Sequence, residues 1–292
     1  MNIIILGAGA IGSLFGALLS KKNNVLLIGR TLHTNAIRKR GLKIEGKTRF
    51  NQKIPAVHSI DDVMFSPDLL ILTVKSYDTE SAIKTARKMI NKNTIVLSLQ
   101  NGLDNIDKME KFIARRQIIA GVTTHASLFS KPGLIKHTGK GKIILGELNG
   151  RKTKRIENIV NIFNEAGVET IVSVDIVKEI WIKAIINSSI NPLTTIFECK
   201  NGYLLQNPIL ERIVERVCEE STGIANANGI KLSYIDMLEK TKEVINYTSE
   251  NYSSMLQSFK KGRKTEIGSI NGKIVEIGEK HNVEPMISEV LI

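Results

Sequence analysis

The segment 181–194 (WIKAIINSSINPLT) carries three polar side chains whose spacing could serve ligand binding. Lys183, Asn187 and Asn191 are four residues apart, which places them along one side of a helix otherwise rich in isoleucine. An ammonium and two amides on such a face are unfavourable when they are buried without partners. The partner is either a polar ligand or a polar network between helices. Because Pro192 disfavours a helical conformation at the preceding residue, we expect a kink or a helix end there.

A second group of polar residues lies near the C-terminus. Asn251 and Ser254 precede Glu266, which stands 12 residues after Ser254. Small hydroxyls, an amide and an acid suit a small ligand that carries a carboxylate or a hydroxyl group. The same residue types are equally typical of helix capping, so this group alone does not decide between the two interpretations.

The glycines near the N-terminus predict a different kind of site. Gly7, Gly9 and Gly12 follow an apolar run at 2–6 and open a helical pattern that reaches about residue 20. In this context Gly7 permits a tight turn, Gly9 lets the backbone approach a pyrophosphate, and Gly12 allows close packing of helix and strand. The helix N-terminus favours the phosphate charge. The pattern predicts a dinucleotide site, and the alternative is a glycine-rich turn without a ligand.

The end of the second apolar run, at 25–28, indicates which dinucleotide is bound. A site for NAD usually has an acid there to bind the ribose 2′-hydroxyl. This chain has Arg30, 18 residues after Gly12, and no acid before Gly41. A guanidinium suits a 2′-phosphate, and Thr31 could add a hydroxyl, so we expect NADP(H). The alternative is that Arg30 is an ordinary surface residue.

Two further polar segments follow predicted buried strands. Lys75 lies in 73–77 (TVKSY), and Asn101 lies in 98–103 (SLQNGL). Ligands of open α/β sheets bind beyond the carboxyl ends of the strands, so both side chains could contact cofactor or substrate. For Asn101 and Gly102 taken alone, a turn is the better interpretation.

These candidates require two kinds of supporting structure. Strands are predicted at 69–74, 94–99, 118–123 and 169–174, alternating with helices at 78–90, 105–113 and 156–166, and an added hairpin around 133–146 near the sheet edge. After about residue 174 only helical spacing remains, at 175–197, 208–228, 233–255 and 266–281. The fold class is therefore α/β followed by α. We expect a Rossmann-type dinucleotide-binding domain at 1–172 and an all-helical domain at 173–292.

Composition narrows the function classes. The chain has 292 residues, a 42% hydrophobic share and two cysteines, which excludes a disordered or disulfide-framed protein and fits a reducing cytoplasm. The net charge of +12 permits a nucleic-acid partner. However, the basic residues are scattered and no aromatic residues alternate with them, so we favour solvated faces and an anionic ligand. We expect no metal site and no targeting or membrane-spanning segment.

Taken together, GxGxxG, TVKSYDT, SLQNGL, TTHA, WIKAIINSSINPLT, SSMLQ and TEIGSINGK resemble the ketopantoate reductase (2-dehydropantoate 2-reductase) family, in family order from residue 3 to about 286. The resemblance implies NADPH-dependent reduction of 2-dehydropantoate to (R)-pantoate, a step of pantothenate and coenzyme A biosynthesis. It also implies a small keto-acid substrate. Together with the composition, this leads us to expect a cytoplasmic monomer or homodimer with neither nucleic acid nor membrane as a partner.

The resemblance also implies roles for individual residues. Lys183 falls on the family's proton donor, and Glu266 on its acidic site residue. The substrate-binding positions fall on Asn101, Asn187, Asn191, Asn201, Asn251 and Ser254. The cofactor contacts fall on Gly7, Ala8, Gly9, Ala10, Ile11, Gly12, Arg30, Lys75, Asn101 and Ala126. Two departures are Ser258, where the family commonly has aspartate, and the basic stretch 260–262, which put the local helix geometry in doubt.

The implied chemistry agrees with these residue types. Hydride transfer to a keto carbon leaves an alkoxide, which a positioned ammonium can stabilise and protonate. Two rivals stay open. One is a related Rossmann-plus-helical dehydrogenase that acts on another 2-keto or hydroxy acid. The other is a non-catalytic nucleotide sensor or nucleic-acid binder.

Overall fold

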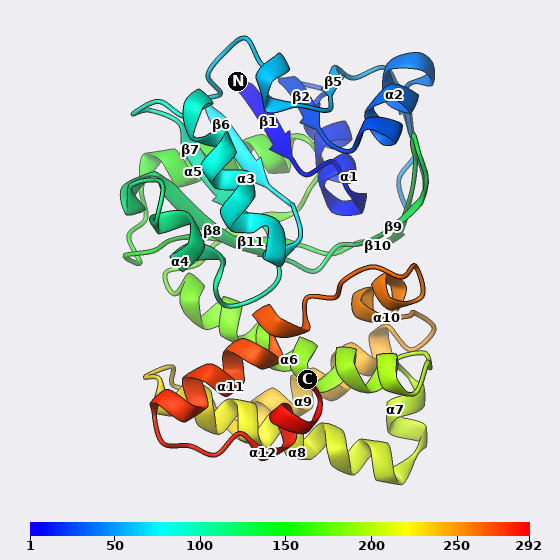
Figure 1. Cartoon of the computed structure of the whole chain (residues 1–292), viewed down its shortest axis with the longest axis vertical. Coiled ribbons are helices and arrows are strands. Elements are labelled where there is room, and N and C mark those ends of the chain that lie inside the picture. The colour runs from blue at the N-terminus through cyan, green and yellow to red at the C-terminus, as the bar shows by residue number, and fades with distance from the viewer. The chain divides into compact units, whose positions relative to one another are not determined.

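The computed structural model describes all residues from Met1 to Ile292 and separates into two compact units (Figure 1). Unit 1 contains Met1–Gln100 and Asn105–Ile176, and unit 2 contains Asn101–Asp104 and Val177–Ile292. The division at Ile176 lies four residues after the boundary expected from the sequence. The short segment Asn101–Asp104, expected in the first domain, packs with the helical unit instead.

The main sheet of unit 1 has eight strands in the order β12-β11-β8-β7-β6-β1-β2-β5. All neighbours are parallel except β11 and β8. The strands are β1 Asn2–Leu6, β2 Asn24–Ile28, β5 Ala56–Val57, β6 Leu69–Leu72, β7 Ile95–Ser98, β8 Ile118–Thr123, β11 Ile143–Glu147 and β12 Thr170–Val172. The α-helices of this unit are α1 Ala10–Leu19, α2 Thr31–Arg40, α3 Thr79–Ala86, α4 Asn105–Glu110 and α5 Lys154–Glu165. Its 3-10 turns are η1 Ile60–Asp62, η2 Ser76–Asp78, η3 Arg87–Met89 and η4 Arg115–Gln117.

The sheet is buried on both faces. Ile3 and Ile5 of β1 belong to one apolar cluster, whereas Ile4 and Leu6 belong to another. Successive side chains of a strand point to opposite faces, so both faces of this strand are covered. This explains why its sequence is a continuous apolar run rather than an alternating one, as expected for a central parallel strand.

A second, four-stranded sheet in unit 1 has the order β4-β3-β10-β9. Its strands are β3 Leu42–Gly46, β4 Phe50–Gln52, β9 Ala126–Lys131 and β10 Leu134–Gly139. The prediction of a single hairpin around 133–146 at the edge of the main sheet was wrong. The hairpin is formed by β9 and β10 in this separate sheet, while β11 joins the main sheet beside β8.

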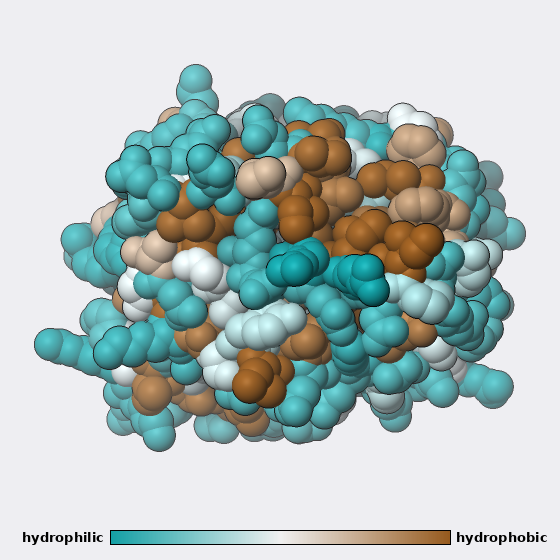
Figure 2. Space-filling view, turned by 90° about the horizontal axis from the view of Figure 1, so that it is seen from below, coloured by the Kyte–Doolittle hydropathy of each residue, from teal (hydrophilic) through white to brown (hydrophobic).

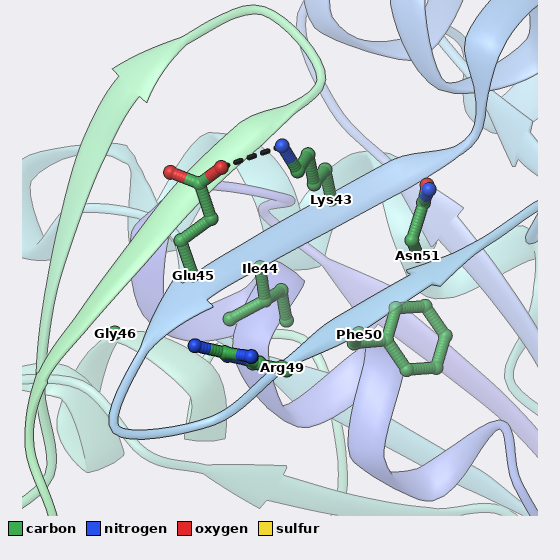
Figure 3. Close-up of a pocket in the computed structure, with 7 residues that line it drawn as sticks. All are labelled: Lys43, Ile44, Glu45, Gly46, Arg49, Phe50 and Asn51. Atoms are coloured by element: carbon green, nitrogen blue, oxygen red, sulfur yellow. Dashed lines mark ion pairs between the residues drawn. The ribbon is translucent and has the colours of Figure 1, made fainter.

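A groove lies along the β3–β4 hairpin of this small sheet (Figure 3). Lys43 and Glu45 line it and form an ion pair of 2.6 Å, and Arg49 and Asn51 contribute from the other side of the hairpin. None of the site residues expected from the sequence lines this groove. We assign it no part in the candidate site.

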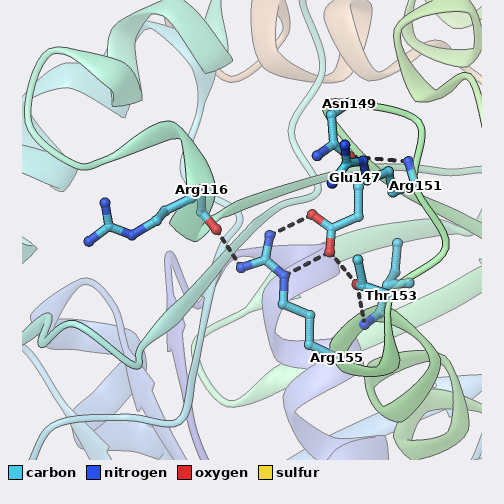
Figure 4. A network of polar contacts seen from close by, with 7 residues as sticks. Arg116, Glu147, Asn149, Arg151, Thr153 and Arg155 are labelled. Carbon is cyan, nitrogen blue, oxygen red and sulfur yellow. Dashed lines mark hydrogen bonds and ion pairs between the residues drawn. The ribbon is translucent and has the colours of Figure 1, made fainter.

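A polar network fixes α5 to the end of β11 (Figure 4). Glu147 is 4% exposed and accepts two hydrogen bonds from Arg155, at 2.7 and 2.5 Å, and one from the Thr153 hydroxyl. Arg155 also donates to the carbonyl of Arg116. Burial alone would raise the pKa of Glu147, but these hydrogen bonds outweigh it and lower the pKa. Since every group in the network is bonded to another, its role is structural.

Unit 2 is helical, as the sequence predicts. Its elements are α6 Ile176–Ile196, α7 Tyr203–Gln206, α8 Pro208–Ala227, α9 Tyr234–Tyr247, α10 Ser254–Phe259, η5 Ile267–Ser269, α11 Asn271–Lys280 and α12 Met286–Val290. Two apolar clusters form its core, one around Trp181 and Ile185 and one around Ile190 and Leu193. All four of these residues lie on α6, which is therefore the central helix of the unit.

Two helix predictions in this unit need correction. The range 233–255 is not one helix, because α9 ends at Tyr247 and α10 begins only at Ser254. Pro192 does not end the helix either, since α6 continues through it to Ile196.

The molecule's surface is mixed in character. None of its helices combines the length and the apolar composition needed to cross a bilayer. Unit 2 leaves some large apolar side chains exposed, among them Ile209, Ile235 and Tyr247. Figure 2 shows one face of the molecule on which apolar areas, drawn brown, are surrounded by hydrophilic residues.

Candidate active site

The turn after β1 contains three glycines, and the structure requires glycine at only two of these positions. Gly7 has a φ of +108°, and a Cβ there would lie 2.4 Å from the backbone nitrogen of Val74. A Cβ on Gly12 would lie 2.3 Å from the carbonyl oxygen of Gly7. A Cβ on Gly9 would have no neighbour nearer than 3.9 Å. Packing within the chain therefore requires Gly7 and Gly12 but not Gly9, which fits a glycine that leaves room for a ligand.

The turn leads directly into the N-terminus of α1. Gly9 is the N-cap, so no side chain caps the start of α1, and no acidic residue lies in its first turn. The first N–H groups of a helix have no partner within the helix, and the helix dipole makes this end attractive to anions. These features fit a pyrophosphate at Gly9, Ala10 and Ile11.

The end of β2 lies against this turn. Backbone N–H groups of Gly7 and Ala8 donate to the carbonyl of Ile28, at 3.0 and 2.8 Å. A Cβ on Gly29 would lie 2.8 Å from the Cβ of Ala8, so only glycine fits this approach. Arg30 comes next, as the exposed N-cap of α2. The position of Arg30 near the glycine turn is thus set by close packing of backbone.

The end of β6 approaches the turn from the other side. The Thr73 hydroxyl donates to the carbonyl of Gly7 at 2.9 Å, and the Thr73 N–H donates to that of Leu6. Lys75 follows two residues later, half-buried, where it caps η2. Since β1, β2 and β6 are parallel neighbours, their carboxyl ends bring the glycine turn, Arg30 and Lys75 to one edge of the sheet. Ala126, also half-buried, begins β9 of the small sheet.

Unit 2 contains a lysine with an unusual electrostatic environment. Burial lowers the pKa of Lys183 to about 8, although the negative charge of Glu266 acts in the opposite direction. Glu266 is 7% exposed, and the side-chain amide of Asn101 donates to its Oε2 at 3.4 Å. An amide, a carboxylate and an ammonium from three separate segments are thus gathered in one unit. Such a lysine can hold a proton at neutral pH and also release it readily.

The remaining amides lie on two segments of the same unit. Asn187 is half-buried and Asn191 is 5% exposed, both on α6 with Lys183. Asn201 is buried, and its side-chain amide donates to the Thr248 hydroxyl at 2.8 Å, while its backbone N–H donates to the carbonyl of Asn251. The Oδ1 of Asn201 is buried without a hydrogen-bond partner. An acceptor in this state fits a ligand that brings a hydroxyl group.

The helix cap that the sequence left open near Ser254 is made by the preceding serine, Ser253. Ser253 is the N-cap of α10, and its hydroxyl oxygen accepts from the N–H of Leu256 at 3.1 Å. It also accepts from the hydroxyl of Thr194 on α6, at 2.8 Å. Ser254 is exposed, and its hydroxyl is not used for capping. The sequence could not distinguish these two adjacent serines.

Comparison with known proteins agrees with this arrangement. The model described as "Ketopantoate reductase PanE/ApbA" matches residues 3–150, and the one for the C-terminal part of the same family matches residues 175–291. The chain belongs to the ketopantoate reductase family. This confirms the resemblance predicted from the sequence motifs and the two-part fold class.

Relatives and solved structures of similar size support the assignment. The chain is 43% identical to the 2-dehydropantoate 2-reductase of Pyrococcus abyssi, covering 100% of this chain and 95% of the relative. It is 42% identical to that of Pyrococcus horikoshii with the same coverage. Two solved structures are each 30% identical and cover 100% of this chain and 96% of theirs. They are D-mandelate dehydrogenase with NADH and anilino(oxo)acetate, with a TM-score of 0.95, and a PanE/ApbA family ketopantoate reductase from Ralstonia eutropha JMP134, with a TM-score of 0.92.

Sequence reasoning missed how two of the sequence motifs pair in the structure. Gly102 has a φ of +101°, and a Cβ there would lie 2.9 Å from Ser269. The N–H of Leu103 donates to the carbonyl of Ser269 at 3.0 Å, and the Ser269 hydroxyl donates to Asp104 at 3.2 Å. This pairing places Asn101 beside Glu266. Nothing in the sequence indicates it, because the two segments are about 165 residues apart.

A buried histidine contact was also missed. The N–H of Gly133 donates to Nδ1 of His33 at 3.0 Å, so neutral His33 carries its proton on Nε2 and donates to the hydroxyl of Ser13 at 3.0 Å. Burial lowers the pKa of His33 to about 4, which keeps the ring neutral. His33 thereby connects α2, which begins right after Arg30, to α1 and to the β9–β10 hairpin. The sequence offers no signal for it beyond a histidine in a polar stretch.

Proposed function

We propose that this protein reduces 2-dehydropantoate to (R)-pantoate with NADPH, a step of pantothenate and coenzyme A biosynthesis. The observation that carries the proposal is Lys183, whose pKa is lowered to about 8 beside the buried carboxylate of Glu266. An ammonium with such a pKa suits the protonation of an alkoxide near neutral pH. The names of the Pyrococcus relatives support 2-dehydropantoate as the substrate.

In this proposal unit 2 supplies the proton. The keto oxygen of the substrate accepts a hydrogen bond from Nζ of Lys183, and the proton moves from Nζ to that oxygen as negative charge develops on it. Glu266 holds the ammonium form through its charge, and Asn101 keeps the carboxylate oriented through its 3.4 Å hydrogen bond. The substrate carboxylate and hydroxyl are bound, without repulsion of an anion, by Asn187, Asn191, Asn201, Asn251 and Ser254.

Unit 1 supplies the cofactor site in this proposal. The bound nicotinamide provides the hydride, and the protein's task is to hold the dinucleotide. The free N–H groups of Ala10 and Ile11 at the start of α1 bind the pyrophosphate, with Gly7 and Gly12 shaping the turn and Gly9 leaving room for the ligand. Arg30 binds the 2′-phosphate and thereby selects NADPH, and Lys75 and Ala126 complete the cofactor contacts of unit 1. Asn101, expected at the cofactor as well, belongs to unit 2.

A second candidate is reduction of another 2-keto acid with NADH. It is favoured by the similarity to D-mandelate dehydrogenase, whose structure holds NADH and anilino(oxo)acetate. Against it stand the sequence relatives, which are more similar to this chain, and Arg30 at the position where an NAD site usually has an acid. Turnover of different keto acids with each cofactor separates the two candidates.

The cellular context belongs to the same proposal. We infer a cytoplasmic enzyme that acts as a monomer or homodimer, with no nucleic-acid, membrane or metal partner. Both cysteines, Cys199 and Cys218, are free thiols, which suits a reducing compartment. Several lysines of the basic excess are in ion pairs, such as Lys242 with Glu211 and Glu215. This pairing favours solvated charged faces over a nucleic-acid surface.

The test is NADPH oxidation by the purified protein with 2-dehydropantoate, pyruvate and 2-ketoisovalerate, each repeated with NADH. We expect the highest kcat/KM with 2-dehydropantoate and NADPH. Faster turnover of another keto acid with NADH would favour the second candidate. Salt-sensitive DNA binding without any turnover would contradict both and favour a non-catalytic protein.

A further inference from the structure

Helix α6 has a gap in its hydrogen bonding at the place where it carries the candidate site residues. In an α-helix each carbonyl accepts from the N–H four residues later. Pro192 has no N–H, so the carbonyl of Ser188 lacks its usual partner. The helix nevertheless continues to Ile196. Another group therefore has to serve that carbonyl.

Asn271 provides the replacement. Its side-chain amide donates to the carbonyl oxygen of Ser188 at 3.3 Å, across 83 residues of sequence. Asn271 is the first residue of α11 and is completely buried. The hydroxyls of nearby residues do not serve this carbonyl, because Ser189 and Thr195 donate to other carbonyls of α6 and Thr194 donates to the Ser253 hydroxyl.

The two polar atoms of the Asn271 side chain differ: the amide nitrogen makes the hydrogen bond to Ser188, whereas the oxygen makes none. Its Oδ1 is buried and has no hydrogen-bond partner. A buried acceptor without a partner is destabilising, and a leucine of similar volume would avoid it. Leucine, however, would leave the carbonyl of Ser188 unbonded.

Two features connect this contact to the proposed chemistry. Ser188 lies directly after Asn187, so the proline gap separates Lys183 and Asn187 from Asn191 along the helix. Asn271 also follows Glu266 by five residues, so one short segment carries both the acid and the amide. A rotation of roughly 10° at the gap would displace a residue one turn away by about 1 Å, enough to slow a reaction that depends on orientation.

We propose that Asn271 is a positioning residue that replaces the hydrogen bond lost at Pro192 and thereby keeps Lys183, Asn187 and Asn191 in line on α6. This inference rests on the proposed function, since it assigns these three side chains to one substrate. Asn271 itself does not touch the substrate.

Pro192→Ala makes the proposal testable, because it returns an N–H to the helix. We expect Asn271→Leu to lower kcat for 2-dehydropantoate by roughly 10–100-fold while the Kd for NADPH stays within about threefold. In the Pro192→Ala background the same change should lower kcat by less than about threefold. A control is Asn226→Leu, which removes a side-chain amide of α8 that donates to the carbonyl of Leu232 and accepts from its N–H, and which should leave kcat unchanged.

Equal loss of kcat in both backgrounds, or no loss in either, would overturn the proposal. If Asn271→Leu does not fold, recovery of a folded protein by Pro192→Ala supports the proposal, and failure to recover overturns it. If the wild-type enzyme reduces no keto acid, the proposed function fails, and thermal unfolding still decides this inference. Asn271→Leu should then lower Tm by about 2–4 °C with Pro192 present and by clearly less in the Pro192→Ala background. An equal loss of Tm in both backgrounds would contradict it.

Discussion

The two units build their halves of the candidate site from different materials. In unit 1 the site is built mainly of backbone, namely a glycine turn that requires Gly7 and Gly12, strand ends and the start of a helix, to which the side chains of Arg30 and Lys75 are added. In unit 2 it consists of side chains on three segments far apart in the sequence, represented by Asn101, Lys183 and Glu266. The backbone site is visible in the sequence because only glycine satisfies its geometry. The side-chain site becomes visible only when the chain is folded.

The two units also differ in the pKa values of their buried histidine and lysine side chains. In unit 1 burial lowers the pKa of His33 and His125 to about 4, so both rings are neutral and serve as hydrogen-bonding and packing groups. In unit 2 burial lowers the pKa of Lys183 only to about 8, because Glu266 opposes the shift. A lysine that titrates near 8 carries a proton to donate at neutral pH, whereas the two histidines, which titrate near 4, are already deprotonated there. We therefore place the proton chemistry in unit 2.

The largest expected effect tests this assignment at Lys183. Lys183→Ala should lower kcat by roughly 10²–10⁴-fold, because the proton donor is lost while the fold is kept. Steady-state kinetics with 2-dehydropantoate and NADPH measure it. Lys280→Ala, at an exposed lysine of α11, is the matched control and should leave kcat unchanged. A near-normal kcat for Lys183→Ala would remove the lysine from the mechanism.

A second change asks whether Glu266 acts through Lys183. Glu266→Gln keeps the shape of the side chain and removes the charge that raises the pKa of the lysine. We expect kcat/KM for the keto acid to fall by about 10²-fold. The alkaline limb of the kcat profile should also move to lower pH, because the ammonium form becomes less stable.

The pH profile of Glu266→Gln separates two roles. An unchanged alkaline limb with weaker keto-acid binding would mean that Glu266 contacts only the substrate. A large loss of NADPH affinity, measured by fluorescence, would contradict its place on the substrate side.

Arg30 tests the cofactor half in unit 1. Arg30→Ala should weaken NADPH binding by roughly 1.5–3 kcal/mol, the size of a charge-assisted hydrogen bond, and leave NADH nearly unaffected. Binding titrations with the two cofactors give this difference directly. Equal catalytic efficiency of the wild-type enzyme with NADPH and NADH would show that Arg30 does not select the cofactor.

The smallest expected effect is on the pH dependence of stability and comes from His33 and His125 in unit 1. Between about pH 6.5 and 4 the unfolded chain binds protons that folded His33 and His125 do not, so stability falls as pH falls through this range. The loss should be about 1–3 kcal/mol after allowance for partial solvent access. Above pH 6.5 these histidines should have no effect on the pH dependence of stability.

Urea unfolding followed by two probes locates this acid sensitivity. The only tryptophan, Trp181, lies in unit 2, whereas circular dichroism reports on both units. If the units unfold separately, the acid shift should appear in circular dichroism before it appears in tryptophan fluorescence. A shift seen only in the fluorescence would place the acid sensitivity in unit 2 and contradict its origin in the two histidines of unit 1.

Much of the fold could be predicted from the sequence. The alternating apolar runs and the glycine turn predicted unit 1, because buried parallel strands and tight turns restrict residue types locally. The small sheet was missed since its partners, such as β3 and β10, are about 90 residues apart. At Pro192 the sequence left a kink or a helix end open, and the helix end is excluded because α6 continues to Ile196.

The candidate site was predictable to a similar degree. Lys183, Asn187 and Asn191 could be grouped from spacing alone because one helix carries them. The contact of Asn101 with Glu266 depends on Gly102 packing against Ser269, a tertiary contact without a local signature. The roles of these residues came from the resemblance to a family, because spacing groups side chains without assigning them chemistry.

The central claim is that unit 1 binds the cofactor and unit 2 supplies the proton, and one binding measurement tests it most directly. The measurement compares the Kd for NADPH of Lys183→Ala with that of the wild-type protein, using NADPH fluorescence as the signal. The account predicts values within about threefold of each other, although kcat differs by roughly 10² or more. A loss of NADPH affinity as large as the loss of kcat would mean that Lys183 serves the cofactor, and would contradict the division of work between the units.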